Sequence, residues 1–143
     1  MIQLLATPEG ILTVFIAIFV GGYLHEGSHW FVGRVGGTEP VLITDYLIVP
    51  KAVDHGQIET MDPDIIRLSG VSVLLWIPLA LFSVAHFILE PSLGTLSIAV
   101  AFATVVLMTT ESDIVAVRDP EIYRERWLND EFQAVPAFLP NIP

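Results

Sequence analysis

The sequence contains no cysteine and only one lysine, Lys51, among its 143 residues. Without cysteine the chain can form no disulfide bond and offer no thiolate to a metal ion, so any transition-metal site must use histidine and carboxylate side chains. Six basic residues stand against 16 acidic ones, which gives a formal net charge of −10. This balance argues against a nucleic-acid partner and against docking on anionic lipid, because phosphate groups are bound by clustered lysine and arginine.

The excess of acidic residues has two explanations. An acidic chain with almost no lysine is typical of a halophile, whose salt-rich cytoplasm screens charge while acidic surfaces stay hydrated. The alternative is a chance bias among a small number of loop residues. Composition favours the halophilic source and leaves the second explanation open.

Hydrophobic residues make up 53% of the chain and gather in three long runs, at about residues 11–31, 65–89 and 93–112. Each run has roughly 18 to 25 residues, enough to cross about 30 Å of hydrocarbon as a helix. Three such runs leave too little polar sequence to enclose them in a soluble domain. We therefore expect an all-α membrane protein whose single domain, 1–143, has three transmembrane helices, a small cytoplasmic β-hairpin or loop and a short C-terminal helix.

Basic residues are unevenly distributed around these runs. The first ten residues and the link between the second and third runs carry none, and the first run therefore lacks the basic start of a signal peptide. The six bases are Arg34, Lys51, Arg67, Arg118, Arg124 and Arg126. Because loops rich in lysine and arginine stay in the cytoplasm, we expect a multi-pass protein of the cell membrane with its N-terminus outside. Residues 34–64 and 118–143 would then be cytoplasmic.

The segments between and after the runs carry local signals. Gly36–Gly37 are expected to end the first helix. Residues 41–49 are β-branched and aliphatic between two prolines, which predicts a strand or one half of a hairpin. Asp119 as the N-cap and Pro120 at the first helical position predict a short helix. Residues 134–143 are expected to form a tail interrupted by prolines.

The stretch "HEGSH" near the end of the first run follows the pattern H-E-x-x-H. Residues at i and i+4 lie on one face of a helix, so His25 and His29 can direct ring nitrogens at one ion. Glu26 lies close enough to take a proton from a water on that ion and pass it to a leaving amine. Two histidines packed in a helix bundle are the alternative, but ionisable residues within a membrane are costly and mark functional sites. The pattern predicts a metal-dependent peptide-bond hydrolase.

A catalytic zinc ion usually takes three protein ligands and a water, so H-E-x-x-H is one ligand short. The third run ends on the same expected side of the membrane and offers two carboxylates there, Glu111 and Asp113. Two residues apart on a helix correspond to about 200° of rotation, so only one of them can face the first helix. The residues alone leave both open.

Three stretches resemble the site-2 protease family of intramembrane zinc metalloproteases. "HEGSHWFVGRVGGTEPVL" resembles the family's first core helix and the loop that opens its small β-element. "IIRLSGVSVLLWIPLALF" is similar to the second core helix, which often opens with a serine/alanine–glycine segment. "TTESDIVAV" is the nearest match to the third core helix, which brings an aspartate to the metal within a leucine–aspartate–glycine motif. The resemblance covers roughly residues 11–117.

The resemblance implies one catalytic Zn²⁺ ion held by His25, His29 and Asp113, with Glu26 as the catalytic residue. It implies a substrate that is a membrane-embedded or membrane-adjacent peptide, cleaved near the cytoplasmic face. The sequence departs from the family in three ways: no glycine follows Asp113, Ser72 lies near the position of a frequent asparagine, and no PDZ domain is present. Two rivals stay open, a non-proteolytic metal-binding membrane protein (a transporter or an inactive homologue) and a membrane zinc peptidase with Glu111 as third ligand.

Other polar residues have simpler explanations. His55 lies in the expected cytoplasmic loop and could approach the site, although a loop histidine is usually solvated. His86 is expected at the outer interface, across the membrane from the metal. Arg67 is expected to anchor the inner boundary, with stabilisation of an oxyanion as the alternative. The strand in residues 41–49 could hold an unwound substrate by strand addition or could close the helix bundle.

Overall fold

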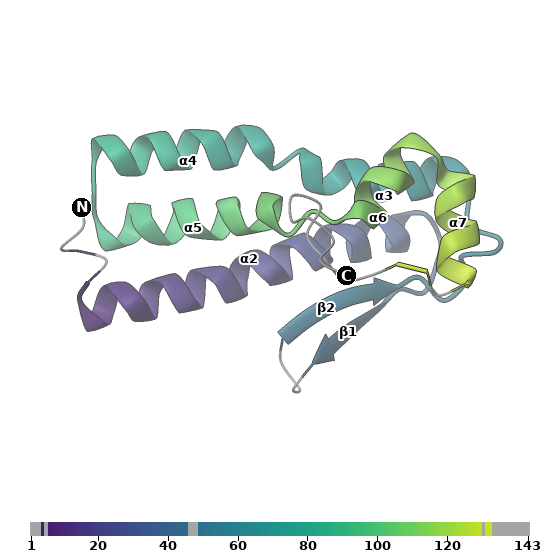
Figure 1. Ribbon diagram of the computed structural model, residues 1–143, viewed down its shortest axis with the longest axis horizontal. Coiled ribbons are helices and arrows are strands. Elements are labelled where there is room, and N and C mark those ends of the chain that lie inside the picture. Colours follow the sequence, from purple (N-terminus) through teal and green to yellow (C-terminus); the bar gives the residue numbers. More distant parts are fainter. Residues whose placement is uncertain (1–3, 5, 46–48, 130, 133–143) are drawn as a thin grey trace.

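The structure is a computed structural model, mostly helical with one small sheet (Figure 1). It describes residues 4, 6–45, 49–129 and 131–132. The expected proline-interrupted tail, 134–143, lies outside the described residues, and so do residues 46–48 within the predicted strand.

The first apolar run forms the long helix α2, Pro8–Val35. The Thr7 side chain caps its start by accepting a hydrogen bond from the backbone N–H of Gly10 (3.0 Å), and Pro8 occupies the first turn, where it costs no hydrogen bond. The helix ends at Val35 and Gly36 is its C-cap, as predicted. Its 28 residues correspond to about 42 Å, so it is long and apolar enough to cross a membrane.

The second run forms two helices in line, α3 (Pro63–Leu74) and α4 (Ile77–Leu89). Pro78 explains the break between them, because a proline has no N–H to bond the carbonyl four residues earlier, here that of Leu74. Taken together, the 27 residues of Pro63–Leu89 are also long and apolar enough to cross a membrane.

The third run differs from its prediction. Its helix α5, Leu93–Leu107, has 15 residues and ends five residues before the predicted limit at 112. At about 1.5 Å per residue it is near 22 Å long, which is shorter than the hydrocarbon layer. The chain then turns and starts a separate short helix, α6, Glu111–Arg118. In the described part of the chain two helical segments, α2 and the in-line pair α3 and α4, rather than the expected three, meet the length of a membrane span.

The expected hairpin and C-terminal helix are present. Strands β1 (Val41–Asp45) and β2 (Val49–Asp54) pair antiparallel, with an irregular register after Ile43. Helix α7, Pro120–Leu128, starts as predicted, because the Asp119 side chain accepts a hydrogen bond from the backbone N–H of Ile122 (3.1 Å).

The elements divide into two ends (Figure 1). At one end α5 lies between α4 and the first half of α2, with a small core of Phe87, Leu96 and Ala99. At the other end α3 and the hairpin pack against the second half of α2, while α6 and α7 pack against α3 and against each other. A second core lies at this end and contains Ile58, Met61, Ile66, Ala116 and Tyr123.

Large apolar side chains are exposed on the outer faces of the three-helix end. They include Ile11, Leu12, Phe15, Ile16, Phe19, Leu79, Leu81, Phe82, Ile88, Leu89 and Ile98. Within the most apolar 18 residues of α2 and of Pro63–Leu89, only 33% and 17% are buried, whereas the core helix of a soluble protein is mostly buried. An exposed apolar surface this extensive marks contact with a membrane or a partner.

Candidate metal and active site

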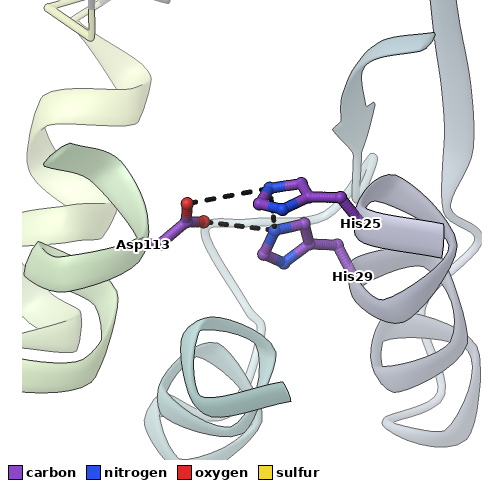
Figure 2. Close-up of side chains that lie close together, drawn as sticks. All are labelled: His25, His29 and Asp113. Carbon is purple, nitrogen blue, oxygen red and sulfur yellow. Dashed lines mark hydrogen bonds and ion pairs between the residues drawn. The ribbon is translucent and has the colours of Figure 1, made fainter. Parts of the chain in front are cut away.

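Two histidines from the second half of α2 and an aspartate from α6 come together (Figure 2). His25 and His29 project from one face of α2, and Asp113 projects toward them from α6. The Nε2 atoms of the two histidines are 3.3 Å apart. Asp113 Oδ1 lies 3.1 Å from Nε2 of His29, and Oδ2 lies 3.8 Å from Nε2 of His25. All three side chains are buried, and together they could hold a metal ion.

Neighbouring helices orient both imidazole rings. Nδ1 of His25 donates to the carbonyl oxygen of Val105 on α5, 2.8 Å away. Nδ1 of His29 is hydrogen-bonded to the hydroxyl of Ser69 on α3, 2.9 Å away. A histidine whose Nδ1 is engaged in this way presents its Nε2 lone pair to a metal. The rings are therefore positioned as ligands by helices other than the one that carries them.

The carboxylate of Asp113 is held from its own helix. Its Oδ2 atom accepts hydrogen bonds from the backbone N–H of Thr110 (2.6 Å) and from the Thr110 hydroxyl (3.0 Å), which caps the start of α6. Burial by itself would raise the pKa of Asp113, but the hydrogen bond with His29, the two neighbouring imidazoles and the Thr110 N–H together lower it below its ordinary value. The carboxylate therefore stays ionised, as a metal ligand must be.

The cluster forms part of the wall of a cavity of about 360 Å³, within the size range of ligand sites. Glu26 lines the same cavity and is 6% exposed. Strand β2 covers another part of it through Ala52 and Val53, and α7 contributes Tyr123. The arrangement places a carboxylate beside a potential metal site in a half-open cavity, which suits proton transfer to and from a bound substrate.

The structure separates the two carboxylates that the sequence offered as third ligand. Glu111 turns away from the histidines and pairs with Arg126 on α7, with Oε1 and Nη1 2.8 Å apart. Its side chain is 56% exposed, whereas that of Asp113 is 8% exposed. The two side chains thus leave α6 in different directions, as their spacing requires.

His86 and Arg67, which were expected outside the catalytic site, lie away from the cavity. His86 stacks against Phe82 on α4, at the three-helix end of the molecule. Arg67 donates to the carbonyl oxygen of Val117 (3.2 Å) and pairs with Asp64, so it ties α3 to α6. Neither residue lines the cavity.

The sequence alone indicated a solvated loop residue at His55 and did not single out Tyr123. Both are buried and line the cavity. Burial, followed by the neighbouring His29, lowers the pKa of His55 to about 4. Burial and the nearby carboxylates raise the pKa of Tyr123 above its ordinary value. No local pattern indicated either residue, because a hairpin and a helix remote in sequence bring them to the site.

Comparisons of the chain with protein-family models, with curated proteins and with solved structures gave no match. Function must therefore be inferred from the residues of the site and from the surface around it.

Proposed function

We propose that the chain is an intramembrane zinc endopeptidase of the site-2 protease type. Its substrate would be a membrane-embedded or membrane-adjacent peptide, cleaved near the cytoplasmic face. The observation that carries this proposal is the meeting of His25, His29 and Asp113 beside Glu26 in one cavity. Three metal ligands, a general base and a cavity that can receive a substrate are the parts that a zinc peptidase needs.

The spacing of the three ligands supports zinc. In tetrahedral coordination with zinc–nitrogen distances near 2.0–2.1 Å, neighbouring ligand atoms lie about 3.3 Å apart. The two histidine nitrogens are 3.3 Å apart, and Nε2 of His29 lies 3.1 Å from Oδ1 of Asp113, so both separations are close to this value. A set of two imidazoles and one carboxylate also suits zinc by ligand type.

Each residue then has a defined part in hydrolysis. A bound zinc ion supplies a Lewis acid that polarises a carbonyl group and lowers the pKa of water. His25, His29 and Asp113 would hold the ion, while Val105 and Ser69 keep the two rings aligned. Glu26 accepts a proton from the attacking water and delivers it to the nitrogen of the leaving amine, after which the carboxylate is regenerated.

The surface supports a membrane location for this site. The exposed apolar side chains belong to the three-helix end, and two helices have the length and composition of membrane spans. All six basic residues lie in the elements at the opposite end, where the site is. The positive-inside rule therefore favours a cell-membrane protein with its N-terminus outside and its site toward the cytoplasm.

The test is to purify the full chain in detergent, measure its zinc content and incubate it with a model transmembrane peptide. We expect about one zinc per chain and cleavage products detectable by mass spectrometry. The matched control, Glu26→Gln, should keep the zinc and lose hydrolysis, because an amide accepts no proton from water. His25→Ala should lose zinc as well.

Two outcomes would favour other functions. Near-native hydrolysis by Glu26→Gln would show that the proposed mechanism is wrong. Zinc bound by a wild-type protein that cleaves no membrane peptide would favour the non-proteolytic metal-binding protein.

A further inference from the structure

His55 lies in the wall of the same cavity, although it belongs neither to the H-E-x-x-H pattern nor to α6. It follows strand β2 directly and is 4% exposed. Its Nδ1 atom is buried and has no hydrogen-bond partner among the residues that the structure describes. Leaving a buried polar atom unpaired costs free energy, so a histidine at this position is not explained by packing alone.

Close contacts fix the His55 ring. A Cβ atom added to Gly33 would lie 2.5 Å from Nδ1 of His55 and 3.0 Å from its Cε1, so the ring packs directly on the glycine backbone. Gly33 follows His29 by four residues, which places the two on the same face of α2. The residues on either side of His55 form a tight turn, in which the Asp54 side chain accepts a hydrogen bond from the backbone N–H of Gly56 (2.8 Å). The ring is therefore held against the face of α2 that carries the metal ligands.

This environment defines where the proton of His55 resides. A buried N–H without an acceptor is tolerated less often than a buried acceptor without a donor, so the surroundings of Nδ1 favour the neutral tautomer with its proton on Nε2. The ring is neutral at neutral pH, because burial keeps its pKa low. A fixed N–H in the wall of the cavity is a donor of the kind that stabilises developing negative charge during catalysis.

We propose that His55 is a further catalytic residue, whose Nε2–H donates a hydrogen bond to the carbonyl oxygen of the peptide bond under attack. The inference rests on the proposed hydrolase function. As the water oxygen bonds to the carbonyl carbon, the π electrons of the carbonyl move onto its oxygen and the water proton passes to Glu26. When the C–N bond breaks, the carbonyl re-forms and the amine nitrogen receives the proton from Glu26. His55 keeps its own proton throughout, and its hydrogen bond stabilises the negative charge that builds up on the carbonyl oxygen.

The experiment compares His55→Leu and His55→Gln in the full-length, zinc-loaded chain, with His86→Leu as the control histidine. We expect His55→Leu to lower kcat about 100-fold, the usual cost of one oxyanion donor, while KM and zinc content stay near the wild-type values. His55→Gln should keep part of kcat, because its amide N–H can still donate. His86→Leu should behave as the wild type does.

A binding measurement separates this role from a structural one. A phosphinic peptide carries charged oxygens on a tetrahedral phosphorus and resembles the transition state, so His55→Leu should raise its Kd by about the same factor as it lowers kcat/KM. The uncleaved substrate, bound to Glu26→Gln with and without His55→Leu, should show little change in Kd.

The outcomes divide as follows. A near-native kcat in His55→Leu would overturn this inference and leave the proposed hydrolase function standing. Loss of zinc together with kcat would also overturn it, because His55 would then act by keeping the metal ion bound. If His55→Leu fails to fold, Gly33→Ala decides, since it keeps the imidazole but displaces it; we expect zinc to be retained and kcat to fall at least roughly tenfold. Near-native kcat in Gly33→Ala would contradict the inference. A wild-type protein that binds zinc and cleaves nothing would overturn the proposed function, and this inference with it.

Discussion

Gly70 on α3 lies directly against the backbone carbonyl of Asp113 on α6. A Cβ atom added to Gly70 would stand 2.5 Å from that oxygen and 3.2 Å from the Cβ atom of Ala116. The two helices can approach this closely because residue 70 has no side chain. The approach brings the Asp113 carboxylate within reach of His29.

Gly70→Ala should weaken zinc binding by about 10- to 100-fold, the range seen when the supports of metal ligands are changed. The added methyl group has to push α6 away, because the nearest atom is backbone rather than a flexible side chain. Competition with a chelator of known affinity measures the change. Gly94→Ala is the matched control, since its Cβ atom would meet only the Ser92 Oγ, at 3.8 Å. Equal zinc affinity in both variants would contradict the expected role of Gly70.

Ser69→Ala should lower zinc affinity about tenfold with little effect on folding. The change removes the hydroxyl that is hydrogen-bonded to Nδ1 of His29 and leaves the ring free to turn. Ser72→Ala is a control on the same helix, because the Ser72 hydroxyl bonds a carbonyl of its own helix, that of Ser69 (2.6 Å). Both affinities can be read from the same chelator titration, and a larger loss in Ser72→Ala would refute the prediction.

Asp113→Ala should abolish tight zinc binding and hydrolysis, whereas Glu111→Ala should leave both near the wild-type values. Asp113 faces the two histidines, while Glu111 pairs with Arg126 at the surface, where an ion pair contributes about 0–1 kcal/mol. Zinc content and peptide cleavage, measured on both purified variants, decide between them. Loss of zinc in Glu111→Ala with retention in Asp113→Ala would favour the rival peptidase with a glutamate ligand.

A cysteine introduced at Glu59 should be inaccessible to an impermeant thiol reagent added outside intact cells, and one introduced at Glu90 should react. Glu59 belongs to the loop at the site end and Glu90 follows α4 at the other end, and both are exposed. The chain has no cysteine of its own, so each label reports one position. The reverse pattern would show that the proposed orientation is wrong.

The sequence predicted the elements whose signals are local. The apolar run with H-E-x-x-H became α2, the β-branched stretch contains β1 and the first residue of β2, and Asp119 with Pro120 starts α7. The breaks in the other two runs were missed. Apolar composition continues through the first break, at residues 75–76, and the second, at residues 108–110, lies where the predicted third run becomes polar. Pro78 was a signal for the first break. The spacing of Thr110 and Asp113, typical of a capping box, was a signal for the second.

The candidate site was predictable only in part. His25, Glu26 and His29 could be found from one stretch because a helix fixes their relative positions. Asp113 was singled out by a resemblance, and the structure brings it to the two histidines. The placement of His55 depends on the hairpin folding back onto α2 at Gly33, and such a contact leaves no periodic or compositional trace in the sequence.

The contact between His29 on α2 and Asp113 on α6 has a consequence for folding. His29 and Asp113 are 84 positions apart (113 − 29), so an ion bound to both would act as a removable cross-link that closes most of the chain into a loop. Closing a loop of this length restricts the unfolded chain, in the way that a long-range disulfide bond does in a protein that has cysteine. In this cysteine-free protein, the same metal ligands would thus take part in hydrolysis and would link α2 to the last third of the chain.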